Sequence, residues 1–160
     1  MTFTTSVAIS ELGSGAGYAL WGFRAAATGH ADCPTLVDGF KNVFGDYGCP
    51  ALGGLQLLAR ELGMSGGRKI KVACPGCYYT TADELSILAL LSAAQVQDES
   101  RCRAHVAWLM CGKGEDGGLS AAAGVGCVFN SAGMQIAAPQ VEIAFASRKT
   151  ITSLHEAGRA

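Results

Sequence analysis

The chain has 160 residues, of which 49% are hydrophobic and only 16% charged, and its formal net charge at pH 7 is −1. Because both signs of charge are scattered along the sequence, the basic patch of a nucleic-acid or anionic-membrane surface is not expected. The longest apolar run, Leu85 to Ala94, reaches about half of a membrane span and contains two serines. We therefore expect one domain with neither a membrane span nor a nucleic-acid partner.

The N-terminal residues and the cysteine content bear on the cellular location of the protein and on the oxidation state of its thiols. Residues 1–10 lack the basic and apolar regions of a secretory signal, which predicts a cytoplasmic protein with reduced thiols. There are seven cysteines, so complete internal pairing is impossible. We interpret Cys102, Cys111 and Cys127 as small buried hydrophobic residues.

The apolar periodicity predicts a mainly α-helical protein, a single compact domain of five to six helices. Residues 1–15 are interpreted as an N-terminal arm that begins with a short strand, residues 16–146 as the helical domain, and residues 147–160 as a mobile C-terminal tail. The first helix is expected over residues 18–28, where it buries Leu20, Trp21 and Ala25 and ends before Gly29.

Two helices are predicted to begin at Cys-Pro pairs, since proline is well tolerated in the first helical turn. Pro34 follows Cys33, and the helix that runs to Gly45 has the apolar stripe Leu36, Val37, Phe40, Val43 and Phe44. Pro50 follows Cys49 in a helix that is expected to end at Gly63. Gly53 and Gly54 each weaken that helix by about 1 kcal/mol relative to Ala, so we expect the close approach of a neighbouring helix or a ligand there.

The most apolar helix is expected at residues 81–96. Before it, the alternation of residues 69–72 predicts a short strand, and Cys74-Pro75-Gly76-Cys77 suits a type II turn. Thr81 and Glu84 match a capping box. Because the helix is apolar almost all round, it is predicted to lie at the centre of the domain.

Two more helices are expected, over residues 100–110 and 119–130. The first has the inner stripe Cys102, Val106, Leu109 and Met110, with a Glu99–Arg103 ion pair at its start. Residues 134–145 alternate like a strand around Pro139, and we expect them to pair with residues 69–72 in a small sheet.

The sequence from Arg24 to Leu109 resembles a group of small uncharacterised bacterial proteins. The resemblance is carried by Asp32-Cys33-Pro34, Phe44-Gly45, Gly67-Arg68 and Pro75-Gly76-Cys77. It continues in Thr81-Ala82-Asp83-Glu84, Arg103-Ala104-His105 and Trp108-Leu109. The resemblance implies one domain of helical architecture and brings no assigned activity with it.

The sharpest candidate for a cofactor is a zinc site. Cys74 and Cys77 have the two-residue gap that lets two thiolates face one ion, and His30 and Cys33 offer a second such gap. Together they provide a Cys₃His set of the kind that holds Zn²⁺ in a tetrahedron. The alternative is that the Cys74–Cys77 segment is only a tight turn before a helix.

Two other kinds of thiolate chemistry stay open. Cys74 and Cys77 suit a redox pair, although such motifs normally follow the first strand of a βαβ unit, and here three helices come first. The three Cys-Pro pairs also fit haem thiolate ligands, although the first-turn positions of Pro34 and Pro50 already explain those prolines.

No catalytic residues are assigned, because the sequence has no nucleophile elbow, no zinc-protease motif and no phosphate-binding loop. Low charge and high apolar content favour a non-enzymatic role instead, as a structural or accessory module that binds a protein partner or associates with itself. The expected contact region is the turn from Cys74 to Thr80, with Tyr78 and Tyr79. The Cys/His thiolate site is the alternative.

Overall fold

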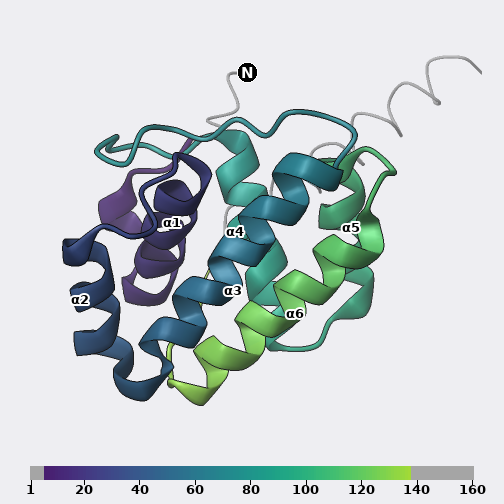
Figure 1. Ribbon diagram of the computed structural model, residues 1–160. Coiled ribbons are helices and arrows are strands. Elements are labelled where there is room, and N and C mark those ends of the chain that lie inside the picture. Colours follow the sequence, from purple (N-terminus) through teal and green to yellow (C-terminus); the bar gives the residue numbers. More distant parts are fainter. Residues whose placement is uncertain (1–5, 138–160) are drawn as a thin grey trace, which may run out of the picture.

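The computed structural model describes residues 6–137, and in them the prediction of a mainly helical single domain is confirmed (Figure 1). The α-helices are α1 (Ser14–Ala27), α2 (Pro34–Phe44), α3 (Gly48–Arg60), α4 (Ala82–Gln95), α5 (Glu99–Met110) and α6 (Glu115–Ser131). Single turns of other helical types are η1 (Ile9–Glu11), η2 (Gly45–Tyr47) and η3 (Glu61–Ser65). None of the helices in this described part is long and apolar enough to cross a membrane.

Helix α4 is the centre of the domain, as predicted. All residues from Asp83 to Leu91 are buried, and the helix packs against α1, α5 and α6. The predicted capping box starts it: the Thr81 side chain accepts from the Glu84 amide, and the Glu84 side chain accepts from the Thr81 amide. A helix without a polar face has to be covered on every side, which explains its position.

An aromatic cluster joins α1, α2 and α6. The rings of Phe40 and Phe44 are stacked with their centroids 5.0 Å apart, and Phe129 meets Phe44 at 4.9 Å. Leu36, Phe40 and Phe44 are buried as predicted, but Val43 is 42% exposed, because the apolar stripe is narrower than the sequence suggests. Trp21, expected in the core, is only partly buried.

Helices α3 and α6 run side by side (Figure 1). A glycine of α3 allows their backbones to approach closely. A Cβ added to Gly54 would lie 3.2 Å from Val125 Cγ2, so the predicted close approach of a neighbouring helix is confirmed there. Gly53 faces open space, and for it the prediction is wrong. The helical backbone also passes Gly63 and ends only after the π-helical turn η3.

The N-terminal segment is more ordered than an arm. Val7 and Leu12 are buried, and α1 begins at Ser14 instead of Tyr18. The backbone of Gln135 packs so closely against Gly15 that a side chain at position 15 would clash with the Gln135 carbonyl. Residues 7–15 therefore pack against the helical domain, and the predicted division into an arm, a helical domain and a tail stays a prediction.

The predicted short strands at 69–72 and 134–145 do not form in the described residues. Residues 69–72 and 134–137 are not paired in a sheet, and the one β-bridge among residues 6–137 joins Ala8 to Tyr79. The side chains of Asp83 in α4 and of its N-cap Thr81 take the backbone hydrogen bonds that a second strand would have used at Lys71. Residues 138–145 and the predicted mobile tail lie outside the described residues.

The last two helices agree with their predictions in outline. The inner stripe of α5 is buried, and Arg103 Nη2 lies 2.8 Å from Glu99 Oε1. Helix α6 begins at Glu115, one turn before the predicted Leu119. Cys102 is buried, but Cys111 and Cys127 are exposed, so their interpretation as core residues is wrong.

Candidate functional site

The longest segment without helix in the described chain connects η3 to α4 across one end of the domain (Figure 1). It comprises residues 66–81 and turns back on itself at Cys74–Cys77, where the Cys77 amide donates to the Cys74 carbonyl at 2.9 Å. Gly76 does not have the positive φ that a type II turn needs at this position, so that predicted turn type is wrong. We call residues 66–81 the connecting loop.

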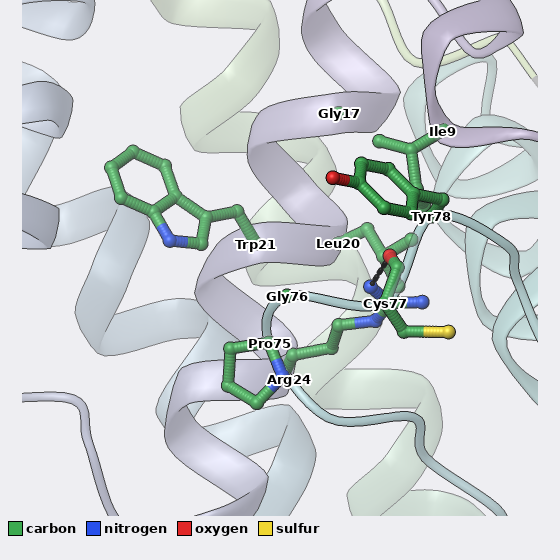
Figure 2. Close-up of a pocket in the computed structure, with 9 residues that line it drawn as sticks. All are labelled: Ile9, Gly17, Leu20, Trp21, Arg24, Pro75, Gly76, Cys77 and Tyr78. Atoms are coloured by element: carbon green, nitrogen blue, oxygen red, sulfur yellow. Dashed lines mark hydrogen bonds between the residues drawn. The ribbon is translucent and has the colours of Figure 1, made fainter.

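Arg24 of α1 holds the returning half of the connecting loop. Its Nε and Nη2 donate to the two carboxylate oxygens of Glu84 at 2.6 and 3.0 Å. Its Nη1 donates to the carbonyl of Cys77 at 2.9 Å (Figure 2). Its Nη2 also donates to the carbonyl of Tyr79 at 2.9 Å. Since five guanidinium N–H groups point in fixed directions, one arginine can fix a carboxylate and two carbonyls at once.

A second arginine holds the outgoing half. Arg68 Nη1 and Nη2 donate to the two oxygens of Asp83 at 2.9 and 2.8 Å, and the Lys71 amide donates to the same carboxylate at 2.8 Å. The Arg68 guanidinium also lies 5.3 Å from the centre of the Trp108 ring. Burial by itself would raise the pKa of Asp83, but the hydrogen bonds from Arg68 and Lys71 outweigh it and lower that pKa.

The N-terminal segment completes the support. The Ile9 amide donates to the Tyr78 carbonyl at 2.8 Å, and the Thr80 amide donates to the Val7 carbonyl at 2.9 Å. The Val7 amide donates in turn to the buried Thr80 hydroxyl at 2.8 Å. The loop backbone on both sides of the two tyrosines is therefore fixed by α1, α4 and the N-terminus.

Two adjacent aromatic side chains are displayed on this fixed backbone. Tyr78 is 81% exposed and Tyr79 is 60% exposed, although their carbonyl groups are both hydrogen-bonded. Most large aromatic side chains are covered in a folded protein, because each removes a large apolar area from water. The sequence prediction placed the contact region at these two residues.

A pocket of about 250 Å³ adjoins Tyr78. Figure 2 shows Trp21 and Tyr78 on opposite sides of α1, with the Pro75–Cys77 backbone passing over Arg24 between them. Gly17, Leu20 and Ile9 complete the lining, so most of it is apolar. In the same view, the Cys77 sulfur points away from the guanidinium of Arg24.

The four predicted zinc ligands are not brought together. Among the described residues, no three side chains of His, Cys, Asp or Glu are arranged to hold a metal ion. Cys33 is exposed at the N-cap of α2, and the exposed His30 places its Nδ1 3.1 Å from the Thr28 hydroxyl. Cys74 is exposed and Cys77 half-buried, both in the turn of the connecting loop.

Pro34 and Pro50 lie in the first turns of α2 and α3, which agrees with the purely structural explanation of their positions. Cys33, Cys49 and Cys74, the predicted haem thiolates, lie on three separate elements. All seven cysteines are free thiols, and the redox interpretation of Cys74 and Cys77 stays a prediction.

Sequence reasoning missed Arg24 and gave Glu84 too small a role. Glu84 was recognised as half of a capping box, but its carboxylate also pairs with Arg24, at a separation of 60 residues in the sequence. The sequence did contain a signal for Arg24, because it lies directly before Ala25-Ala26-Ala27 in a helix of mostly small residues. A charged residue in such a helix is rarely buried without a partner, so an acidic partner could have been expected.

Comparisons of this chain with protein-family models, with curated proteins and with solved structures found no match. The resemblance to small bacterial proteins therefore stays a prediction, and a function can be inferred only from the site itself.

Proposed function

We propose that this protein acts by binding a protein partner through Tyr78, Tyr79 and the adjoining pocket. The observation that carries the proposal is the display of two tyrosines, 81% and 60% exposed, on a backbone that is held by the buried Arg24–Glu84 pair. Tyrosine is enriched among the residues that dominate protein interfaces. A backbone that is already fixed also loses little conformational entropy on binding.

The pocket beside Tyr78 fits this role. Its volume of about 250 Å³ and its mainly apolar lining suit one apolar side chain of a partner rather than a large cofactor. Trp21 contributes to the lining and is itself only partly buried, so a partner side chain that fills the pocket would contact Trp21 as well. We further propose a cytoplasmic location, which is supported by the seven free thiols.

A hydrolytic role has one candidate pair in the described residues, and burial argues against it. Ser86 Oγ lies 3.2 Å from His105 Nδ1, which is the distance of a nucleophile from its base. However, Ser86 is 4% and His105 2% exposed, and they lie between α4 and α5. Because a substrate cannot reach the hydroxyl, we assign this pair to packing.

Site-specific photo-crosslinking tests the proposal. A benzophenone amino acid is placed at position 78 in the cells that naturally make the protein, and the adducts formed on irradiation are identified by mass spectrometry. Position 64 is the matched control, since Met64 is 77% exposed but lies on η3, outside the connecting loop. We expect a discrete protein adduct from position 78 and none from position 64.

A second variant carries the benzophenone amino acid at position 78 together with Tyr79→Ala, and it tests whether the partner also contacts Tyr79. Loss of the adduct in this variant supports a partner that contacts both tyrosines. Equal adducts from positions 78 and 64, or no adduct from either, would show that this surface is wrong. An adduct with twice the mass of the chain would identify self-association as the binding event.

A further inference from the structure

The outgoing half of the connecting loop is bound along one edge to the start of α4. The Lys71 amide donates to Asp83 Oδ2 at 2.8 Å, and the Lys71 carbonyl accepts from the Thr81 hydroxyl at 2.6 Å. Two residues further on, the Ala73 amide donates to Glu84 Oε2 at 3.4 Å. Backbone groups of alternate residues point to the same edge in an extended strand, and residues 71 and 73 show this pattern.

The opposite edge has no partner among residues 6–137. By the same alternation, the amide and carbonyl groups of Ile70 and Val72 point away from α4. Within residues 6–137, none of these four groups has a hydrogen-bond partner. A row of backbone groups without partners is a template for another strand.

The side chains beside this edge define what could pair with it. Lys69 and Lys71 are exposed, whereas Ile70 and Val72 are half-buried and pack against the core. The connecting loop has no acidic residue before Asp83, and Asp83 is already paired with Arg68. In an added strand, every second side chain would therefore lie beside Lys69 and Lys71. The side chains between them would lie beside the apolar Ile70 and Val72.

We propose that the open edge of residues 69–73 binds, by strand addition, an extended segment of a protein partner in which acidic and apolar side chains alternate. This inference rests on the proposed function, because it names the chemistry of the partner. A second copy of the same edge would place lysines opposite lysines, which is unfavourable in a strand pair. Charge repulsion thus disfavours a second copy, and the occupant that we propose is a different chain with complementary charge.

Labelled peptides test the edge directly. Three fluorescent nonapeptides are compared by anisotropy: one alternates Glu and Val, one alternates Lys and Val, and one is the Glu/Val peptide with proline at its centre. We expect the first to bind at least about tenfold more tightly than the second, because of the lysine charges. The third should bind weakly, since proline removes a central amide and cannot continue the ladder.

A matched pair of variants separates the backbone from the side chain. Val72→Pro removes one amide of the open edge, whereas Val72→Ala keeps the amide and loses the same side chain. We expect Val72→Pro to weaken the Glu/Val peptide at least about tenfold and Val72→Ala to weaken it much less. Circular dichroism of both variants verifies that the helices are intact.

Charge reversal gives a second comparison. Lys69→Glu with Lys71→Glu should reverse the preference, so that the Lys/Val peptide binds more tightly, while Lys41→Glu on α2 should leave the order unchanged. Similar binding of all three peptides, or full binding by Val72→Pro, would overturn the proposal. So would a dimer of this chain that Val72→Pro dissociates, because it would make a second copy the occupant.

Failure of this inference can be told apart from failure of the proposed function. A partner adduct at position 78 together with peptides that bind without selectivity leaves the tyrosine surface in place and removes the strand-addition edge. Selective peptide binding with no adduct at position 78 removes the tyrosine surface instead.

Discussion

The guanidinium of Arg24 lies 2.6 Å from the carboxylate of Glu84, and the two side chains are 3% and 0% exposed. This contact joins α1 to the first turn of α4, and the same guanidinium also fixes two carbonyls of the connecting loop. The pair thereby couples the helical core to the backbone that displays Tyr78 and Tyr79. A charge pair with so little water around it is costly unless every hydrogen bond is made.

Removing one member of this pair should destabilise the protein strongly. We expect Arg24→Met or Glu84→Gln to lower the free energy of unfolding by about 3–5 kcal/mol, because each leaves an uncompensated buried group. Urea denaturation measures the loss. The double variant Arg24→Met with Glu84→Leu should recover part of it, and single variants as stable as the parent would contradict the role assigned to the pair.

Two glycines of α6 should respond in opposite ways to alanine. Gly124 faces open space, so Gly124→Ala should stabilise the protein by up to about 1 kcal/mol through helix propensity. A Cβ at Gly126 would lie 3.1 Å from the Ala94 backbone of α4, so Gly126→Ala should destabilise it. Thermal unfolding of the two variants measures the difference, and equal melting temperatures would refute the close packing of α6 on α4.

Acid should destabilise the protein through His105. Burial is the main cause that lowers the pKa of this histidine from 6.5 to about 4, and the charge of Arg101 adds to it. Between about pH 6.5 and pH 4, His105 therefore binds a proton in the unfolded chain but not in the folded protein. The contribution of His105 to the free energy of unfolding is fully present above about pH 6.5 and is lost as the pH falls towards 4. The total loss is about 3 kcal/mol.

The variant His105→Gln provides the comparison for that pH dependence, since an amide can still meet the Ser86 hydroxyl but does not titrate there. The free energy of unfolding is measured by urea titration at intervals from pH 7 to pH 4. We expect a clearly steeper decline in the parent than in the variant. Parallel curves would show that His105 is charged in the folded protein.

Cys33 should be the most reactive of the exposed cysteines. Although it makes no cap hydrogen bond as a thiol, the amides of Leu36 and then of Thr35 favour its thiolate and lower its pKa. Alkylation by iodoacetamide at neutral pH, followed by peptide mass spectrometry, gives the order of reaction. Earlier alkylation of Cys49, Cys74, Cys111 or Cys127, which are also exposed, would contradict this expectation.

Local patterns in the sequence predicted most of the helices, because the interactions involved are close in the chain. The capping box at Thr81 and Glu84 is confirmed, and so are Pro34 in the first turn of α2 and the central position of the helix at 81–96. The two tyrosines were also identified from the sequence, and the structure places both at the surface. Apolar periodicity and caps act within a few residues, so the sequence displays them directly.

Only the tertiary structure decided how the connecting loop is held and what it displays. Residues 69–72 have the alternation of a strand, yet Asp83 and Thr81 take the hydrogen bonds at Lys71. The same packing separated the four proposed zinc ligands and brought Arg24 to Glu84 across 60 residues. Such contacts depend on which helix faces come together, and local spacing does not specify that. The sequence by itself therefore determined the helices, and their packing determined the site.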